Sequence, residues 1–253
     1  MDVNGTAALV TGGGGGLGAA TARLLAKKGA QVALLDVKAD MAEAVAREIG
    51  GLAVACDVTD ARSAEQAVAE AAAKHGAARV LVNCAGVAPA KRIVGKDGPM
   101  PLEEFRRAVE INLIGSFNLM RLAAAGMQTL APLPGGDRGV IVSTASVAAY
   151  EGQVGQAAYA ASKGGIVALT LPAAREFASI AVRVNAIAPG LFATPMLLGM
   201  PQAVQDSLAA SVPYPKRFGT PDEFAHLVLH IVENGMINGE CIRLDGAIRM
   251  QPR

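Results

Sequence analysis

The chain has few cysteines and no tryptophan, and these shortages narrow the class of protein. Its 253 residues include three cysteines, far apart along the chain: Cys56, Cys84 and Cys241. An odd number of widely spaced cysteines excludes a disulfide framework, and the spacing matches no metal-ligand motif. Since His226 and His230 share a predicted helix face without a catalytic glutamate between them, we expect no metal there either.

Charge of one sign and long apolar runs are also missing. The formal net charge is +1 and the charges are scattered, so nothing favours binding to nucleic acid or to a membrane surface. No apolar run reaches the roughly 18 residues of a membrane span. A strand pattern begins within a few residues of Met1, so we expect no signal peptide. We therefore expect a cytoplasmic protein, or one of the mitochondrial matrix if the chain is eukaryotic and processed.

Short apolar runs alternate with helical patterns along the chain. The predicted strands are 6–10, 31–35, 52–56, 79–82, 139–143, 182–188 and 240–244. The predicted helices are 19–28, 40–49, 61–75, 102–129, 157–178 and 221–233. Residues 87–101 are predicted as a loop, and 191–212 as a mobile segment with weak helical signal. The alternation predicts an α/β fold: one domain, 1–253, with a Rossmann-type doubly wound parallel sheet of about seven strands and helices on both faces.

A cluster of glycines joins the first predicted strand to the first helix. Thr11 is followed by glycine at every position up to Gly18 except Leu17. Such a turn lets the backbone approach a pyrophosphate, and the helix N-terminus attracts its charge. Asp36 ends the second strand about twenty residues further on, where a carboxylate can bind ribose hydroxyls and repel a 2′-phosphate. No arginine stands at Asp36 or Val37, so the pattern favours NAD over NADP.

The stretch from Tyr159 to Lys163 places a phenol and an ammonium on one helix face. A nearby ammonium favours the phenolate, so we expect the tyrosine pKa to fall from about 10 toward neutrality. Ser146 follows an apolar strand and can meet the phenol over one carbonyl. Taken alone, the short motif fits a chance pair on a helix surface equally well. Asp57, likewise, fits either an adenine contact or a turn aspartate.

Together these residues resemble the short-chain dehydrogenase/reductase family across the whole chain. The matching motifs are 11–18, Asp57 with Val58, 83–86, Asn112, Ser146, Tyr159 with Lys163, and Pro189-Gly190 with Thr194. Cys84 departs from the usual asparagine. The resemblance implies a cofactor half, 1–138, and a catalytic half, 139–253.

The resemblance also implies the roles of individual residues. Tyr159 is the general base for alcohol oxidation, Lys163 its partner and a ribose ligand, and Ser146 a hydrogen bond to the substrate oxygen. Asn112 would sit in a mid-helix distortion and anchor a water that links Lys163 to solvent. Besides Tyr159 and Lys163, the implied cofactor-binding residues are Gly12, Gly15, Gly16, Leu17, Gly18, Asp36, Asp57, Val58, Asn83, Cys84, Ala85, Gly86, Pro189, Gly190, Phe192 and Thr194. The implied substrate-binding residues are Ser146, Gln156 and Tyr159.

Three stretches, 144–159, 188–192 and 242–250, are most similar to the short-chain 3-hydroxyacyl-CoA dehydrogenases, whose insertion the loop 87–101 also resembles. This subfamily implies an NAD-dependent homotetramer that oxidises 3-hydroxyacyl-CoA, including 2-methyl-branched forms; some members oxidise steroids and alcohols. Lys91, Arg92 and Lys96 of the loop are then either coenzyme A phosphate ligands or solvated charges. Two alternatives stay open: an NADP-dependent 3-oxoacyl-carrier-protein reductase, and a non-catalytic cofactor-sensing or scaffold protein.

Overall fold

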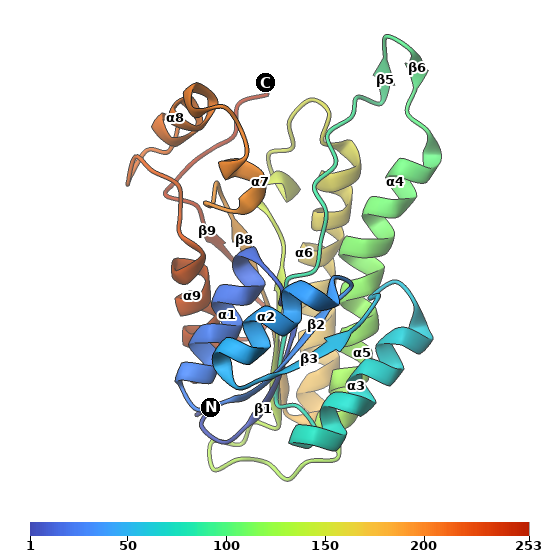
Figure 1. Ribbon diagram of the computed structural model, residues 1–253, viewed down its shortest axis with the longest axis vertical. Coiled ribbons are helices and arrows are strands. Elements are labelled where there is room, and N and C mark those ends of the chain that lie inside the picture. Colours follow the sequence, from blue (N-terminus) through green and yellow to red (C-terminus); the bar gives the residue numbers. More distant parts are fainter. Residues whose placement is uncertain (253) are drawn as a thin grey trace.

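A seven-stranded parallel sheet forms the centre of the computed structural model, which describes residues 1–252 (Figure 1). The strands, in sheet order, are β3 (Leu52–Ala55), β2 (Gln31–Asp36), β1 (Ala7–Thr11), β4 (Val80–Asn83), β7 (Gly139–Thr144), β8 (Val182–Pro189) and β9 (Cys241–Leu244). Every neighbouring pair is parallel. The sheet confirms the predicted doubly wound α/β fold, because strand order runs outward in both directions from β1 and β4.

Helices cover both faces of the sheet. One face carries α1 (Gly16–Lys27), α2 (Ala39–Ile49) and α9 (Pro221–Glu233); the other carries α3 (Ala61–His75), α4 (Leu102–Val109), α5 (Gly115–Gln128) and α6 (Ala157–Phe177). Successive residues of a strand point to opposite faces. Val10 and Val82 accordingly join the first core, and Leu9 and Leu81 the second.

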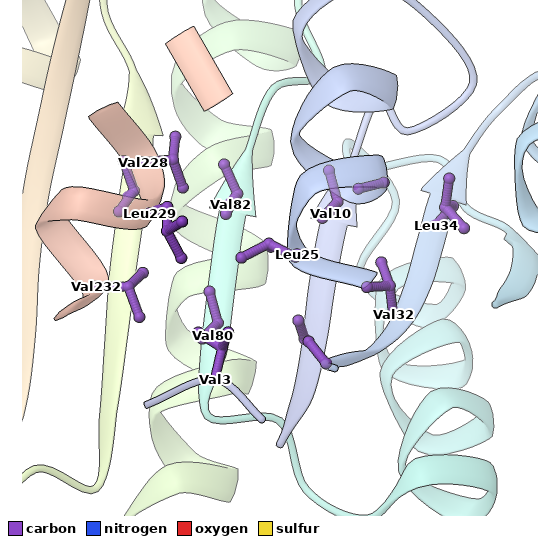
Figure 2. Packing of buried hydrophobic residues seen from close by; sticks show 14 of the residues in the cluster. Val3, Val10, Leu25, Val32, Leu34, Val80, Val82, Val228, Leu229 and Val232 are labelled. Atoms are coloured by element: carbon purple, nitrogen blue, oxygen red, sulfur yellow. The ribbon is translucent and has the colours of Figure 1, made fainter. Parts of the chain in front are cut away.

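The core under α1 and α9 is aliphatic. Figure 2 shows Leu25 of α1 pointing at the sheet beside Val10 and Val82, with Val228 and Val232 of α9 close by. Burying a leucine side chain contributes about 1.5–3 kcal/mol, so this layer fixes α1 and the turn that precedes it.

Several predicted boundaries and one loop need correction. Helix α1 begins at Gly16, three residues before the predicted start, because glycines carry little helical signal. The loop 87–101 contains a short antiparallel hairpin of β5 (Val94–Gly95) and β6 (Gly98–Pro99). The segment 191–212 forms α7 (Pro195–Leu198) and α8 (Gln202–Ala210). Strand β7 ends at Thr144, before Ser146, which begins a 3₁₀ turn over Val147–Ala149.

The long predicted helix 102–129 is interrupted. Between α4 and α5 the chain makes a π-helical turn over Glu110–Ile114, and Asn112 lies at its middle. This confirms the expected distortion. Such turns are rare and commonly mark functional sites.

The segments outside the sheet layers gather beyond its carboxyl edge. The β5–β6 hairpin, α7 and α8 all stand at the top of Figure 1, where the parallel strands end. Ligands of doubly wound sheets bind at this edge. Among the described residues, no helix is long and apolar enough to cross a membrane.

Candidate active site

Strand order reverses between β1 and β4, and Thr11 fixes the ends of both strands. The buried Thr11 hydroxyl accepts hydrogen bonds from the backbone N–H groups of Cys84 and Ala85, both at 3.1 Å. Thr11 opens the glycine motif in the sequence but was not among the predicted site residues. Its structural role follows only from the pairing of the two strands, which places Thr11 beside Asn83.

The glycine turn is packed so closely that a Cβ would come within less than 3.0 Å of another atom at four positions: Gly12, Gly13, Gly14 and Gly18. A Cβ on Gly12, where φ is +63°, would lie 2.8 Å from the Ala85 nitrogen. A Cβ on Gly18 would lie 2.2 Å from the carbonyl oxygen of Gly12. Gly16 also has a left-handed φ, of +51°, which glycine adopts without strain.

The N-terminus of α1 has the features that favour an anion. Gly15 is the N-cap, and no side chain of the described residues caps this helix or places an acid in its first turn. Its first N–H groups and the positive end of its dipole therefore face outward uncompensated. Asp36 is held beside the turn, because its Oδ2 accepts from the Gly14 N–H at 3.0 Å and its Oδ1 from the Lys38 N–H at 2.9 Å. This cradle fits a pyrophosphate with an adjoining ribose.

Two predicted adenine-side residues make local contacts. Asp57 Oδ1 accepts from the N–H and the hydroxyl of Thr59, at 2.9 and 2.7 Å, as a turn aspartate does. Val58 packs on Gly115, where a Cβ would lie 2.5 Å from the valine Cγ2. Their cofactor contacts remain predictions.

The chain that leaves β4 passes the predicted catalytic residues Asn112 and Lys163. The Asn83 side chain faces the interior, where its Nδ2 donates to the carbonyl of Ser116 and to the Ser143 hydroxyl. Burial raises the pKa of the Cys84 thiol to about 11, so the thiol stays protonated at neutral pH. Gly86 lies against the centre of the site, because a Cβ there would be 3.0 Å from Asn112 Oδ1 and 3.6 Å from Lys163 Nζ.

Ser146, Tyr159 and Lys163 meet beyond the end of β7. The Tyr159 phenol lies next to Ser146, whose hydroxyl accepts from the Ala148 N–H at 3.1 Å. Lys163 Nζ lies 6.0 Å from the centroid of the Tyr159 ring. It donates to the carbonyl of Thr144 at 2.6 Å. The helix α6 and the end of β7 thus bring together three side chains that the sequence placed in two motifs.

Burial dominates the electrostatics of this pair and corrects one expectation. The pKa of Lys163 is lowered to about 8 by burial. The pKa of Tyr159 is raised by burial, and the neighbouring Ser146 hydroxyl opposes that rise. The predicted fall caused by Lys163 is wrong for this arrangement, because burial of the phenol dominates and the amine, 6.0 Å from the ring centroid, donates to the Thr144 carbonyl.

Asn112 binds the backbone of Val87 at both polar groups. Its Oδ1 accepts from the Val87 N–H at 2.8 Å, and its Nδ2 donates to the Val87 carbonyl at 2.9 Å. The second proton of Nδ2 goes to the Ser162 hydroxyl at 2.9 Å. Both amide protons are therefore committed within the protein. Sequence reasoning missed Ser162, since a serine on a helix carries no sign of being buried.

The family model for short chain dehydrogenases matches residues 6–204. The chain belongs to this family. It is therefore an oxidoreductase whose family uses a nicotinamide cofactor.

Known relatives extend the match over nearly the whole chain. The human 3-hydroxyacyl-CoA dehydrogenase type-2 is 52% identical over 99% of this chain and 97% of its own length. The Drosophila melanogaster protein of the same name is 49% identical over 96% of this chain and 97% of its own. The crystal structure of 3-hydroxyacyl-CoA dehydrogenase type-2 from Mycobacterium avium superposes with a TM-score of 0.94 at 43% identity, covering 98% of both chains.

In this short-chain dehydrogenase the segment after β8 crosses over the glycine turn. Gly190 allows the backbone of Asp245 to approach, since a Cβ there would lie 2.9 Å from the Asp245 Cα. Phe192 is buried, with its ring against Gly219. The Thr194 side chain lies 3.9 Å from where a Cβ of Gly16 would stand. Leu17 packs on the core below. The structure thus brings the predicted Thr194 to the predicted turn.

A cavity of about 470 Å³ opens next to the catalytic helix of the dehydrogenase. Its lining comes from the hairpin loop, the loop before α6 and α6 itself: Arg92, Ile93, Val94, residues 152–157 and Ala160. Gln156 lies in this lining, and its Oε1 accepts from the Gln153 N–H at 3.0 Å. The two loops are joined by the Lys91 N–H, which donates to the Gly155 carbonyl at 2.7 Å. The Lys91 ammonium pairs with Glu104, so Arg92 is the cation of the loop that faces the cavity.

Proposed function

We propose that this dehydrogenase oxidises the 3-hydroxyl of 3-hydroxyacyl-CoA, including 2-methyl-branched forms, to the 3-oxo group with NAD, reversibly. The observation that carries the proposal is the meeting of Ser146, Tyr159 and Lys163 beside Gly86, next to the glycine turn. Relatives named 3-hydroxyacyl-CoA dehydrogenase that match nearly the full length support the substrate class.

The cofactor site is formed by backbone and one carboxylate. The glycine turn and the α1 N-terminus would hold the pyrophosphate, and Lys163 the nicotinamide ribose. Asp36 would bind the adenosine ribose hydroxyls and repel a 2′-phosphate, which supports NAD over NADP. When bound, the nicotinamide supplies the hydride acceptor.

The protein's own part is to hold the alcohol and to move its proton. The Ser146 hydroxyl would donate to the substrate oxygen, because its lone pair already accepts from the Ala148 N–H. Tyr159 is the base that takes the alcohol proton; burial raises its pKa, and the neighbouring Ser146 hydroxyl opposes that rise. Burial lowers the pKa of Lys163 to about 8, so Lys163 still carries a proton near neutral pH, and it donates to the Thr144 carbonyl beside the site.

The substrate would enter past the cavity beside α6. Ser146, Tyr159 and Gln156 would contact the reacting end, with the apolar Ile93 and Val94 facing the acyl chain and Arg92 facing the coenzyme A phosphates. The homotetramer, a place in fatty acid metabolism and a cytoplasmic location belong to the same proposal. Exposed apolar side chains on α4, the π turn and α5 (Leu102, Ile114 and Phe117) support association between copies.

Initial rates decide between this function and its alternatives. The assay uses 3-hydroxyacyl-CoA thioesters of graded length with NAD and with NADP. The proposal expects NAD-dependent turnover that varies with chain length. Faster reduction of 3-oxoacyl thioesters with NADPH than with NADH would favour the carrier-protein reductase. NAD binding without turnover of any hydroxyacyl-CoA or secondary alcohol would favour a non-catalytic protein.

A further inference from the structure

A chain of buried polar side chains runs under the site from the sheet to the catalytic helix. Its members are at most 6% exposed and come from β7, β4, α5, the π turn and α6: Ser143, Asn83, Ser116, Asn112 and Ser162. Asn83 bonds Ser143 at 3.2 Å, Ser116 donates to the Asn112 carbonyl at 2.7 Å, and Asn112 donates to Ser162 at 2.9 Å. Buried polar groups of this kind hold a unique geometry when they are paired.

Ser162 sets the direction of the last link. Its hydroxyl has one proton, which it donates to the Tyr159 carbonyl at 2.8 Å. Toward Asn112 it therefore acts as an acceptor, and only the Nδ2 side of the amide fits there. This turns Oδ1 to the Val87 N–H and leaves the second Nδ2 proton for the Val87 carbonyl. A reversed amide would lose all three bonds.

The link joins two parts of the site that are distant in sequence. Val87 is the first residue of the loop 87–101, which carries Arg92 to the cavity. Ser162 precedes Lys163 on α6, and its hydroxyl is tied to the Tyr159 backbone. We propose that Ser162 is a positioning residue. It orients the Asn112 amide and so holds the start of the loop 87–101, called the substrate loop below, against the catalytic helix α6. The effect on turnover rests on the proposed function, whereas the geometric link does not.

Ser162→Ala tests the link, with Thr170→Ala as the matched control. Thr170 is also a buried hydroxyl on α6, and it donates only to the Ile166 carbonyl of its own helix. In Ser162→Ala, hydrogen exchange of the peptide that contains Val87 should speed up at least about tenfold, since a protecting contact of 1.4 kcal/mol corresponds to a factor of ten. The control should leave that peptide unchanged. Ser162→Thr, which keeps the hydroxyl, should restore protection, and Ser162→Cys gives a second loss-of-acceptor variant of similar volume.

Kinetics separate positioning from general stability. Ser162→Ala should lower kcat about tenfold and leave the KM for NAD within about twofold, because the turn at Gly12–Gly18 is untouched. In an Asn112→Ala background, Ser162→Ala should lower kcat no further, because both changes remove the same link. Unchanged exchange at Val87 in Ser162→Ala, or additive losses in the double variant, would overturn the proposal. If the wild-type chain turns over no hydroxyacyl-CoA, the proposed function fails, and the exchange comparison still decides the role of Ser162.

Discussion

The glycine turn and the catalytic face are both at the carboxyl edge of the sheet, yet they are built in opposite ways. At the turn, the proposed function depends on missing side chains: a single added carbon at Gly18 would lie 2.2 Å from a carbonyl oxygen. At the catalytic face, formed by Ser146, Tyr159, Lys163 and Asn112, the proposed function depends on buried polar side chains, of which Lys163 is 5% exposed and Asn112 fully buried. Adding atoms should therefore damage the first region, and removing polar atoms the second.

The two regions also differ in how burial acts on them. The turn exposes backbone N–H groups and carries no titratable group of its own. The catalytic face buries the Lys163 amine and the Tyr159 phenol. Burial lowers the pKa of Lys163 and raises that of Tyr159, which favours the neutral form of both groups. The first region should be insensitive to pH and the second sensitive to it.

The largest expected effect on stability concerns its dependence on pH. The pKa of Lys163 is lowered from 10.5 to about 8 in the folded protein. Below pH 8 the folded state bears a buried charge; between about pH 8 and 10.5 it loses the proton while the unfolded state keeps it, so stability rises with pH. Relative to Lys163→Met, which does not titrate, the free energy of unfolding of the wild type should rise by about 3 kcal/mol over this interval. Denaturant titrations at several pH values measure it, and a constant difference would contradict it.

A smaller effect tests the turn by adding one carbon. Gly18→Ala should reduce the free energy of unfolding by about 1–3 kcal/mol, since the backbone of Gly12 must move. Gly15→Ala is the matched control: its nearest neighbour would be the flexible Met41 Cε at 3.4 Å, and its φ of −167° suits any residue. The control should cost less than about 1 kcal/mol. Urea unfolding without cofactor provides the comparison, and equal losses for both variants would refute the steric account.

The preference for NAD over NADP should depend on the Asp36 carboxylate. Asp36→Asn keeps an acceptor for the Gly14 or Lys38 N–H but loses the charge, and Asp36→Ala loses both. Asp36→Ala should raise the KM for NAD about tenfold, the factor that corresponds to 1.4 kcal/mol. In both variants the preference for NAD over NADP should shrink. An unaltered preference, measured as the ratio of kcat/KM values, would show that Asp36 does not select the cofactor.

The smallest expected effect concerns the substrate loop. Arg92→Ala and Lys96→Ala should together raise the KM for an acyl-CoA about threefold, in line with the 0.2–1 kcal/mol of exposed ion pairs. A short thioester without the nucleotide should show no change. Lys91→Ala serves as a control, because its ammonium pairs with Glu104. Equal changes in KM for the two substrates would show that the loop does not bind the nucleotide part of coenzyme A.

Elements with strong local sequence signals were predicted accurately, and elements with weak signals were not. Helices α3 and α9 were predicted to the residue, because Asp60 caps the first and Thr220, Pro221 and Glu223 form a capping box at the second. Helices α7 and α8 gave only a weak helical signal, and α8 has no buried residue, so its spacing carries no strong pattern. The site motifs were found because together they resemble one family, whereas the pair of Tyr159 and Lys163 taken alone fits a chance pair equally well.

Features that depend on contacts in the folded interior could not be predicted from the sequence. The π turn was expected only by resemblance, since the tertiary contacts of Asn112 with Val87 have no sequence period. The sequence gives no sign of whether a serine on this helix is buried, as Ser162 is, or exposed. The direction of the Tyr159 pKa was wrong because spacing gives the neighbour of a phenol but not its burial.

In the proposed reaction Tyr159 moves the proton of the alcohol, so its phenolic oxygen is the one atom to remove. Tyr159→Phe should lower kcat for a 3-hydroxyacyl-CoA about 10²–10⁴-fold, the contribution of general acid–base catalysis. Its affinity for NAD, measured by fluorescence titration, should stay close to that of the wild type. A variant that binds NAD normally and turns over substrate within a few-fold of the wild-type rate would contradict the account.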